Sequence, residues 1–206
     1  TNIDGCYIDF LYTLPADDYM VGMSIQPHNM QLALAQNMSS IELQWNQTIP
    51  QQEKGRKFEE KYAQLQYMFV GGDIEKLSEV KADRAKESAR LKWIAYKDQF
   101  FSTVLIADDA FESTQMESTP LNALSRYIKE YNTTTSLPLD ITGKKTTDLH
   151  YYLGPNHYNT LKAYDKDVEK ADRLHLNELV PLGWKIVSWI NKALVIPMFN
   201  LFTSWG

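Results

Sequence analysis

Four histidines and one cysteine are the residues of this chain best suited to metal binding or nucleophilic chemistry. The histidines, His28, His150, His157 and His175, are scattered and lack the spacing of a zinc site. Cys6 lies in an apolar stretch and is predicted to be a buried structural thiol. The chain has no glycine-rich phosphate loop, nucleophile elbow or HExxH sequence. The sequence therefore predicts no catalytic residue, no metal site and no cofactor.

Two pairs of adjacent acids and one polar motif are the other candidates for acid–base chemistry. Asp17–Asp18 and Asp108–Asp109 are each predicted to lie in a turn, where short polar side chains stabilise the backbone. The motif Gly154–Tyr158 (GPNHY) predicts the start of a helix with Asn156 as its N-cap. A catalytic role for His157 is the less favoured alternative.

The stretch from residue 179 to residue 206 combines many apolar and aromatic residues with few charges. Lys185 and Lys192 are its only charged residues, whereas the whole chain has a formal net charge of -5. On a helix, the two lysines would lie on one side and Trp184 on the other. This pattern is typical of a helix lying in the interfacial layer of a membrane. The predicted membrane-interface residues are Trp184, Lys185, Trp189, Lys192, Phe199, Phe202 and Trp205.

A second interpretation of the first two turns of this segment stays open. They could form a helix docked on the domain's own sheet. The apolar run from 193 to 205 then adds more apolar surface than one docked helix needs, which favours the interfacial interpretation. The run from 193 to 202 is too short to cross a bilayer and contains Pro197.

Composition limits the class of protein and its partners. A chain of 206 residues with 44% hydrophobic residues can form one substantial core. Its acidic balance argues against a nucleic-acid partner, because phosphate binding needs a basic surface. The chain starts at Thr1 without a signal region, so we expect it to be part of a larger protein.

Two-residue alternation predicts that most of the chain forms antiparallel strands. Tyr19–Ile25 and Ile41–Asn46 alternate regularly between apolar and polar positions. Leu91–Tyr96 and Phe100–Ala107 predict a hairpin, and the second of these strands is apolar on both faces, as expected at the centre of a sandwich. Further strands are expected at 65–70, 114–118, 125–131, 136–141 and 148–153.

The remaining segments predict helices and connections. Charged residues around Phe58 and Tyr62 predict a short surface helix within 51–64, and a second helix is expected after Pro155. The densely charged run Lys81–Arg90 is predicted to be a solvated helix or a long loop. We divide the chain into a β domain at 1–172 and a helical, amphipathic segment at 173–206.

Several blocks of the sequence resemble the YidC family of bacterial membrane protein insertases, in the form found in Bacteroidetes. The most specific are Leu149–Tyr158 (LHYYLGPNHY), Leu161–Asp165 (LKAYD) and Leu179–Trp184 (LVPLGW). Leu91–Phe101 (LKWIAYKDQFF) is similar to a hairpin of that family, and Leu11–Pro15 (LYTLP) to an early strand and turn. The resemblance extends from about Leu11 to the end of the chain.

The resemblance implies a fold, a location and a set of partners. The chain would be much of the large periplasmic domain, with a mainly antiparallel β-supersandwich of the galactose mutarotase type and C-terminal helices. Its last segment would lie on the outer leaflet of the bacterial inner membrane, before a spanning helix. Sec translocon components and nascent membrane proteins are the partners that the family implies. The insertion chemistry of the family belongs to the membrane core, so no catalytic residue is transferred to this sequence.

The predicted function is therefore a non-enzymatic periplasmic domain that supports the insertion and folding of inner-membrane proteins. The alternative is a carbohydrate-binding or mutarotase-like module, which the expected fold permits but does not establish. A mutarotase would need an acid and a base that face one cleft, and the sequence alone does not assemble such a pair.

Overall fold

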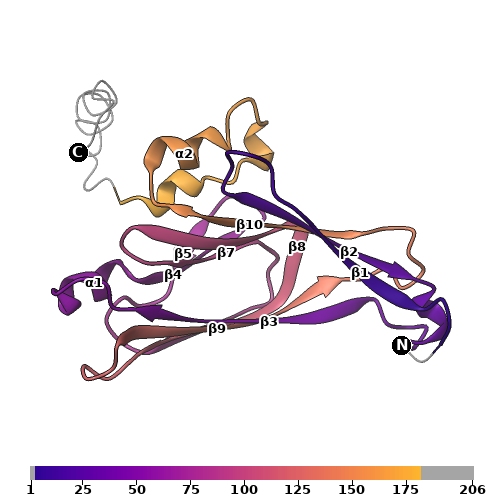
Figure 1. The fold of residues 1–206 in the computed structure, drawn as a ribbon, viewed down its shortest axis with the longest axis horizontal. Coiled ribbons are helices and arrows are strands. Elements are labelled where there is room, and N and C mark those ends of the chain that lie inside the picture. The colour runs from indigo at the N-terminus through magenta and orange to yellow at the C-terminus, as the bar shows by residue number, and fades with distance from the viewer. Residues whose placement is uncertain (1–2, 182–206) are drawn as a thin grey trace.

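The computed structural model describes residues 3–181 of this chain, and its elements are mostly strands (Figure 1). The ten strands are β1 (Tyr7–Thr13), β2 (Met20–His28), β3 (Ser40–Pro50), β4 (Gln64–Phe69), β5 (Ile74–Lys76), β6 (Asp83–Glu87), β7 (Leu91–Lys97), β8 (Phe101–Pro120), β9 (Tyr127–Pro138) and β10 (Thr147–Pro155). The helices are α1 (Arg56–Tyr62), α2 (Tyr158–Ala163) and the 3₁₀ turns η1 (Met30–Leu32), η2 (Lys170–Asp172) and η3 (Leu176–Leu179).

The strands form two antiparallel layers, which we call the upper and lower sheets after their places in Figure 1. The upper sheet has the order β1-β2-β10-β8-β7-β4-β5. The lower sheet has the order β6-β8-β9-β3, with β3 and β9 paired over nearly their whole lengths. All strand pairs in residues 3–181 are antiparallel, as the regular alternation in the sequence predicts.

Strand β8 belongs to both sheets. Its first part pairs with β7 and β10 in the upper sheet, and its last part pairs with β6 and β9 in the lower sheet. The pairing shifts register between Glu112 and Gln115, and Ser113 has a positive φ of 49° at this point. An irregularity of this kind bends a strand and increases its twist, so the chain passes from one layer to the other without a loop.

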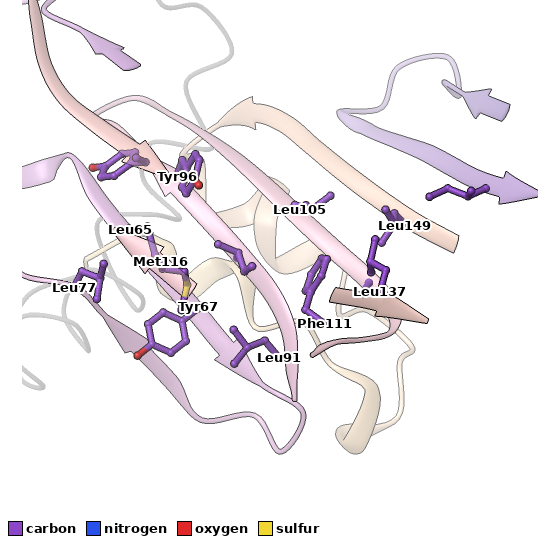
Figure 2. Packing of buried hydrophobic residues seen from close by; sticks show 14 of the residues in the cluster. Leu65, Tyr67, Leu77, Leu91, Tyr96, Leu105, Phe111, Met116, Leu137 and Leu149 are labelled. Carbon is purple, nitrogen blue, oxygen red and sulfur yellow. The ribbon is translucent and has the colours of Figure 1, made fainter. Parts of the chain in front are cut away.

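The main core fills the space between the two sheets (Figure 2). Leu65, Leu105 and Leu149 of the upper sheet contribute to it, together with Met116 and Leu137 of the lower sheet, and all are at most 1% exposed. An aromatic stack crosses this layer. The ring of Trp45 on β3 lies 3.8 Å from that of Tyr96 on β7, and the Tyr96 hydroxyl donates to the Trp45 carbonyl at 2.9 Å.

A second, smaller core covers the other face of the upper sheet. Trp93 of β7 and Tyr152 of β10 point to this side, where they are fully buried against Leu161 of α2 and Leu176 and Leu179 of η3. Helix α2 therefore lies above the upper sheet in Figure 1. The upper sheet is buried on both faces over its middle strands, which explains why Phe100–Ala107 shows no alternation in the sequence.

These observations confirm several predictions. The fold class is mainly antiparallel β, in a sandwich with few helices near the C-terminal end. The β7–β8 hairpin and the helices α1 and α2 occur where the sequence predicts them. The alternating strand around Trp45 is half-buried along its whole length. Cys6 is 3% exposed, and its thiol donates to the carbonyl of Asn29 at 3.2 Å.

Several local predictions were wrong. The strands expected at 125–131 and 136–141 form one strand, β9, and the strand expected at 114–118 is the second half of β8. The charged run Lys81–Arg90 contains strand β6, whose Arg84 and Lys86 point to solvent while Ala85 packs on the core. Pairing with β8, a tertiary contact, overrides the weak strand propensity of this run. Asp108–Asp109 lies within β8 rather than in a turn. Asn156 does not cap α2, because its side chain instead bonds to Ser102 and to the carbonyls of the β7–β8 turn.

Candidate functional site

The structure builds a platform where the chain leaves the β-sandwich, formed by residues 173–181 on the outer face of the upper sheet. The indole Nε1 of Trp93 donates to the Leu174 carbonyl at 2.7 Å. Leu176 and Leu179 are 0% and 1% exposed and pack against the second core. These leucines keep the turn in place, because burying one leucine side chain stabilises the fold by about 2–3 kcal/mol. The platform fixes the position of the backbone up to Val180.

Two carboxylates hold the platform and its neighbouring helix. Asp165, which follows α2, accepts hydrogen bonds from the backbone N–H groups of Leu174 and His175 at 2.6 and 2.9 Å. Asp18, in the β1–β2 turn, accepts a hydrogen bond from the Tyr164 hydroxyl at 2.5 Å. This hydrogen bond is the main reason that the pKa of Asp18 lies below its usual value. The β1–β2 turn, α2 and the platform are thereby joined.

The seven residues predicted to lie at the membrane interface all follow the platform in sequence. Trp184, Lys185, Trp189, Lys192, Phe199, Phe202 and Trp205 lie outside the described residues. The described part of the chain ends at Pro181, three residues before Trp184. In residues 3–181, no helix has the length and apolar character needed to span a membrane.

A groove of about 510 Å³ runs along the outer face of the upper sheet, over β1, β2 and β10. Its lining includes Leu11 and Thr13 of β1, Gly22 of β2 and His150 of β10. The His150 Nδ1 lies 3.0 Å from an Asp108 carboxylate oxygen, and both side chains are about half exposed. The sequence predicts Asp108 in a turn and therefore does not predict this pair. The β8–β10 ladder brings the two together although they are 42 residues apart.

The other histidines serve local roles. His28 lies 3.1 Å from Asp9 and stacks on the ring of Tyr7. His157 lies 2.8 Å from the Thr160 hydroxyl, at the start of α2, and not in the groove. Among the described residues, no group of three or more His, Cys, Asp or Glu could hold a metal ion.

Two buried lysines lie at the end of the sandwich that carries α1, where they form an unexpected cluster. Lys97 of β7 and Lys129 of β9 are 2% and 1% exposed. The Lys97 ammonium donates to the Tyr62 carbonyl at 3.1 Å, and Lys129 donates to the carbonyls of Ala63 and Glu79. Burial lowers the pKa of each lysine to about 8. No sequence pattern marks these two lysines as buried.

Helix α1 is attached to the same end of the sandwich through Arg56. Its guanidinium donates to the carbonyls of Ser125, Leu121 and Tyr127 at 2.8, 2.9 and 3.0 Å, which fixes the β8–β9 hairpin. Its Nε also pairs with Glu60 at 2.7 Å. In both places a largely buried cationic side chain donates to main-chain carbonyls and so holds neighbouring segments of backbone together.

Comparisons with known proteins agree with the resemblance in the sequence. Residues 1–197 match the family model of the YidC periplasmic domain. The curated proteins named membrane protein insertase YidC include one from Azobacteroides pseudotrichonymphae, 50% identical over 198 residues, which cover 96% of this chain and 32% of that protein. The protein from Parabacteroides distasonis is 46% identical, over 96% of this chain and 31% of its own length. The protein from Porphyromonas gingivalis is 35% identical, over 97% of this chain and 33% of its own length. The chain spans about a third of the length of these relatives.

Proposed function

We propose a function from the premise that this chain belongs to the YidC family of membrane protein insertases, of which it matches the periplasmic domain. The domain supports the insertion and folding of inner-membrane proteins, and it does so by contacts rather than by chemical catalysis. It positions the membrane core of the insertase relative to the bilayer. The insertion step itself belongs to the parts of the protein beyond this domain.

The observation that carries this proposal is the platform at residues 173–181. It holds the backbone on the outer face of the sandwich through the Trp93–Leu174 hydrogen bond and the buried Leu176 and Leu179. The next residues in sequence include Trp184 and Lys185, which suit the headgroup level of a membrane. A rigid platform directly before such a segment would set the height and orientation of the domain above the lipid.

The proposal includes the location and partners of the domain. It lies in the periplasm at the inner membrane, with a folded β domain at 1–172 and a C-terminal segment at 173–206, of which the part after Pro181 contacts the membrane surface. Nascent membrane proteins and Sec translocon components are its protein partners. The carbohydrate-binding or mutarotase-like alternative is not favoured, because the relatives named above are insertases.

Liposome flotation tests the membrane contact. The whole chain is compared with a chain that ends at Pro181, which keeps Leu176 and Leu179 in the core, and with the double charge reversal Lys185→Glu and Lys192→Glu. We expect the whole chain to float with anionic vesicles, the shortened chain to remain at the bottom, and the reversed variant to bind weakly, because like charges repel the lipid surface. Equal flotation of the whole and shortened chains would refute the contact.

A second experiment tests the role in insertion. The insertase that contains this domain is reconstituted in proteoliposomes, and the insertion of a model membrane protein is measured for the wild type and for a platform variant, Leu176→Asp. We expect less inserted protein for the variant because the domain loses its fixed position. Leu124→Asp is the matched control, since Leu124 is 95% exposed and far from the platform in sequence. An insertion yield unchanged by Leu176→Asp would refute the positioning role.

A further inference from the structure

A pocket of about 250 Å³ lies beside α1, at the end of the sandwich that holds the two buried lysines. Its walls come from four separate parts of the described chain: α1, the connection between β5 and β6, the end of β8, and β9. The lining residues are Lys57, Glu60, Lys61, Glu79, Val80, Pro120 and Lys129. Because three of these side chains are lysines, the pocket is a candidate site for an anion.

Lys129 supplies a buried cation to this pocket. It is 1% exposed, and its ammonium donates to the main-chain carbonyls of Ala63 and Glu79. An ammonium has three N–H donors, so one donor is left beyond these two contacts. Among residues 3–181, no carboxylate forms a salt bridge with Lys129. A buried charge without a close counter-ion is costly, and an anion in the pocket would reduce that cost.

The two glutamates of the lining do not cancel the charge of its lysines. Glu60 pairs with Arg56 at 2.7 Å, and Glu79 pairs with Lys76 at 2.6 Å. Each carboxylate therefore already has a cation of its own, which lies outside the pocket lining. The lysines of the lining are left with an excess of positive charge.

The other lysines near the pocket add to this excess. Lys57 and Lys61 on α1 are exposed, and neither forms a salt bridge within the described part of the chain. Burial lowers the pKa of Lys129 to about 8; the carboxylates of the lining oppose this shift, and the charge of Lys97 adds to it. Lys129 is therefore mostly charged at pH 7, when an anion would meet it.

The charge and size of the pocket favour a small phosphate monoester. Such a group carries close to two negative charges at neutral pH and three acceptor oxygens, and lysine binds phosphate as a point charge. Val80 and Pro120 add apolar surface that the organic part of the ester can contact. The volume lies below the range of about 300–1,000 Å³ that is typical for drug-sized ligands, so this organic part must be small.

We propose that the pocket beside α1 binds a phosphate monoester, with Lys129 as its buried contact and Lys57 and Lys61 as exposed contacts. The phosphate belongs either to a small free molecule or to a lipid headgroup. Figure 1 shows α1 and the last described residues at the same end of the long axis, so the pocket lies at the end where the chain leaves the sandwich. The lipid source rests on the proposed membrane contact, whereas the site itself does not depend on it.

Isothermal titration calorimetry of the whole 206-residue chain with glycerol 3-phosphate at pH 7.5 tests the site. We expect one molecule to bind per chain, with at least tenfold weaker binding for Lys129→Met and for the double variant Lys57→Met and Lys61→Met. Lys86→Met removes an exposed lysine of β6 and is the matched control, which should bind as the wild type does. Circular dichroism shows that each variant is folded. No saturable binding at millimolar concentration, or undiminished binding by either folded pocket variant, would overturn the proposal.

The pH dependence gives a second readout. Affinity should fall at least fivefold between pH 7.5 and 9.5, because Lys129 loses its proton near pH 8. An affinity that stays constant over this range would overturn the role of Lys129.

Competition with vesicles distinguishes the two sources of the phosphate. Phosphatidic acid presents a monoester, whereas phosphatidylglycerol presents only a diester. Displacement of glycerol 3-phosphate by phosphatidic acid alone supports a lipid headgroup, no displacement supports a free molecule, and equal displacement by both lipids would overturn the preference for a monoester. The insertase that contains this domain is titrated in the same way, and absence of binding there would overturn the proposal. The membrane contact can fail separately, since flotation depends on residues after Pro181.

Discussion

The two buried lysines make the stability of the domain depend on pH in an unusual direction. Burial lowers the pKa of Lys97 and of Lys129 from 10.5 to about 8. Below pH 8 both lysines are charged in the folded and the unfolded chain, so the full cost of burying the charge is present. Between pH 8 and 10.5 the unfolded chain binds more protons than the folded one. The free energy of unfolding therefore rises with pH in this window.

The size of the effect follows from the shift. One pH unit corresponds to about 1.4 kcal/mol per lysine, which sets a limit of about 4 kcal/mol for both lysines between pH 8 and 9.5. Because the two charges also repel each other, their titrations are coupled, and we expect a rise of about 2–3 kcal/mol. The neutral amines still donate to the carbonyls of Tyr62, Ala63 and Glu79, so deprotonation does not break these contacts.

Urea denaturation followed by circular dichroism at pH 7.5, 8.5 and 9.5 measures this rise. The range stops at pH 9.5 because burial raises the pKa of Tyr67 and Tyr96, so that these tyrosines lower stability as pH increases above about 10. The double variant Lys97→Met and Lys129→Met should show a flat profile. Lys86→Met, at an exposed lysine of β6, should keep the slope. A flat or falling profile in the wild type, or a slope that persists in the double variant, would refute the assignment.

Three further predictions concern stability. Gly154→Ala should destabilise the domain by about 1–3 kcal/mol, because the added carbon would lie 2.7 Å from the ring of Tyr152. The control is Gly71→Ala, whose added carbon would have no atom within 4 Å and should change stability by less than about 0.5 kcal/mol. Urea denaturation measures both. Equal effects of the two glycine variants would contradict the packing described. Arg56→Ala should lower the free energy of unfolding by about 2–4 kcal/mol, and with it the melting temperature, because three carbonyls of the β8–β9 hairpin lose their donor. An unchanged melting temperature would show that the anchor is dispensable. Leu176→Ala should lower the free energy of unfolding by about 2–4 kcal/mol and accelerate amide hydrogen exchange at residues 174–180. Unchanged exchange there would contradict the claim that Leu176 holds the platform in place.

The parts of the fold that depend on local patterns could be predicted from the sequence. The alternation around Trp45 places one face of β3 on the core, and the unbroken apolar run before Ala107 places β8 in the middle of the upper sheet. Both patterns reflect which faces of a strand are buried, because successive side chains of a strand point to opposite faces of the sheet.

The parts that depend on pairing between distant residues could not be predicted. Strand β6 forms because it pairs with β8, although four of its five residues are charged. His150 and Asp108 meet only because the β8–β10 register places them side by side. Lys97 and Lys129 have the same side chain as exposed lysines, and they are buried because β7 and β9 bring them against the carbonyls of Tyr62, Ala63 and Glu79.

Strand β8 has a consequence for how the domain responds to load. Two stacked sheets that are joined only by loops can slide or separate when one of them is pulled. Here a single run of backbone passes from the upper sheet into the lower one, and Ser113 marks the bend. A force applied at the platform would reach the lower sheet through covalent bonds, and the layers could part only if the ladders of β8 broke. We therefore expect the domain to behave mechanically as one rigid body that unfolds in a single step.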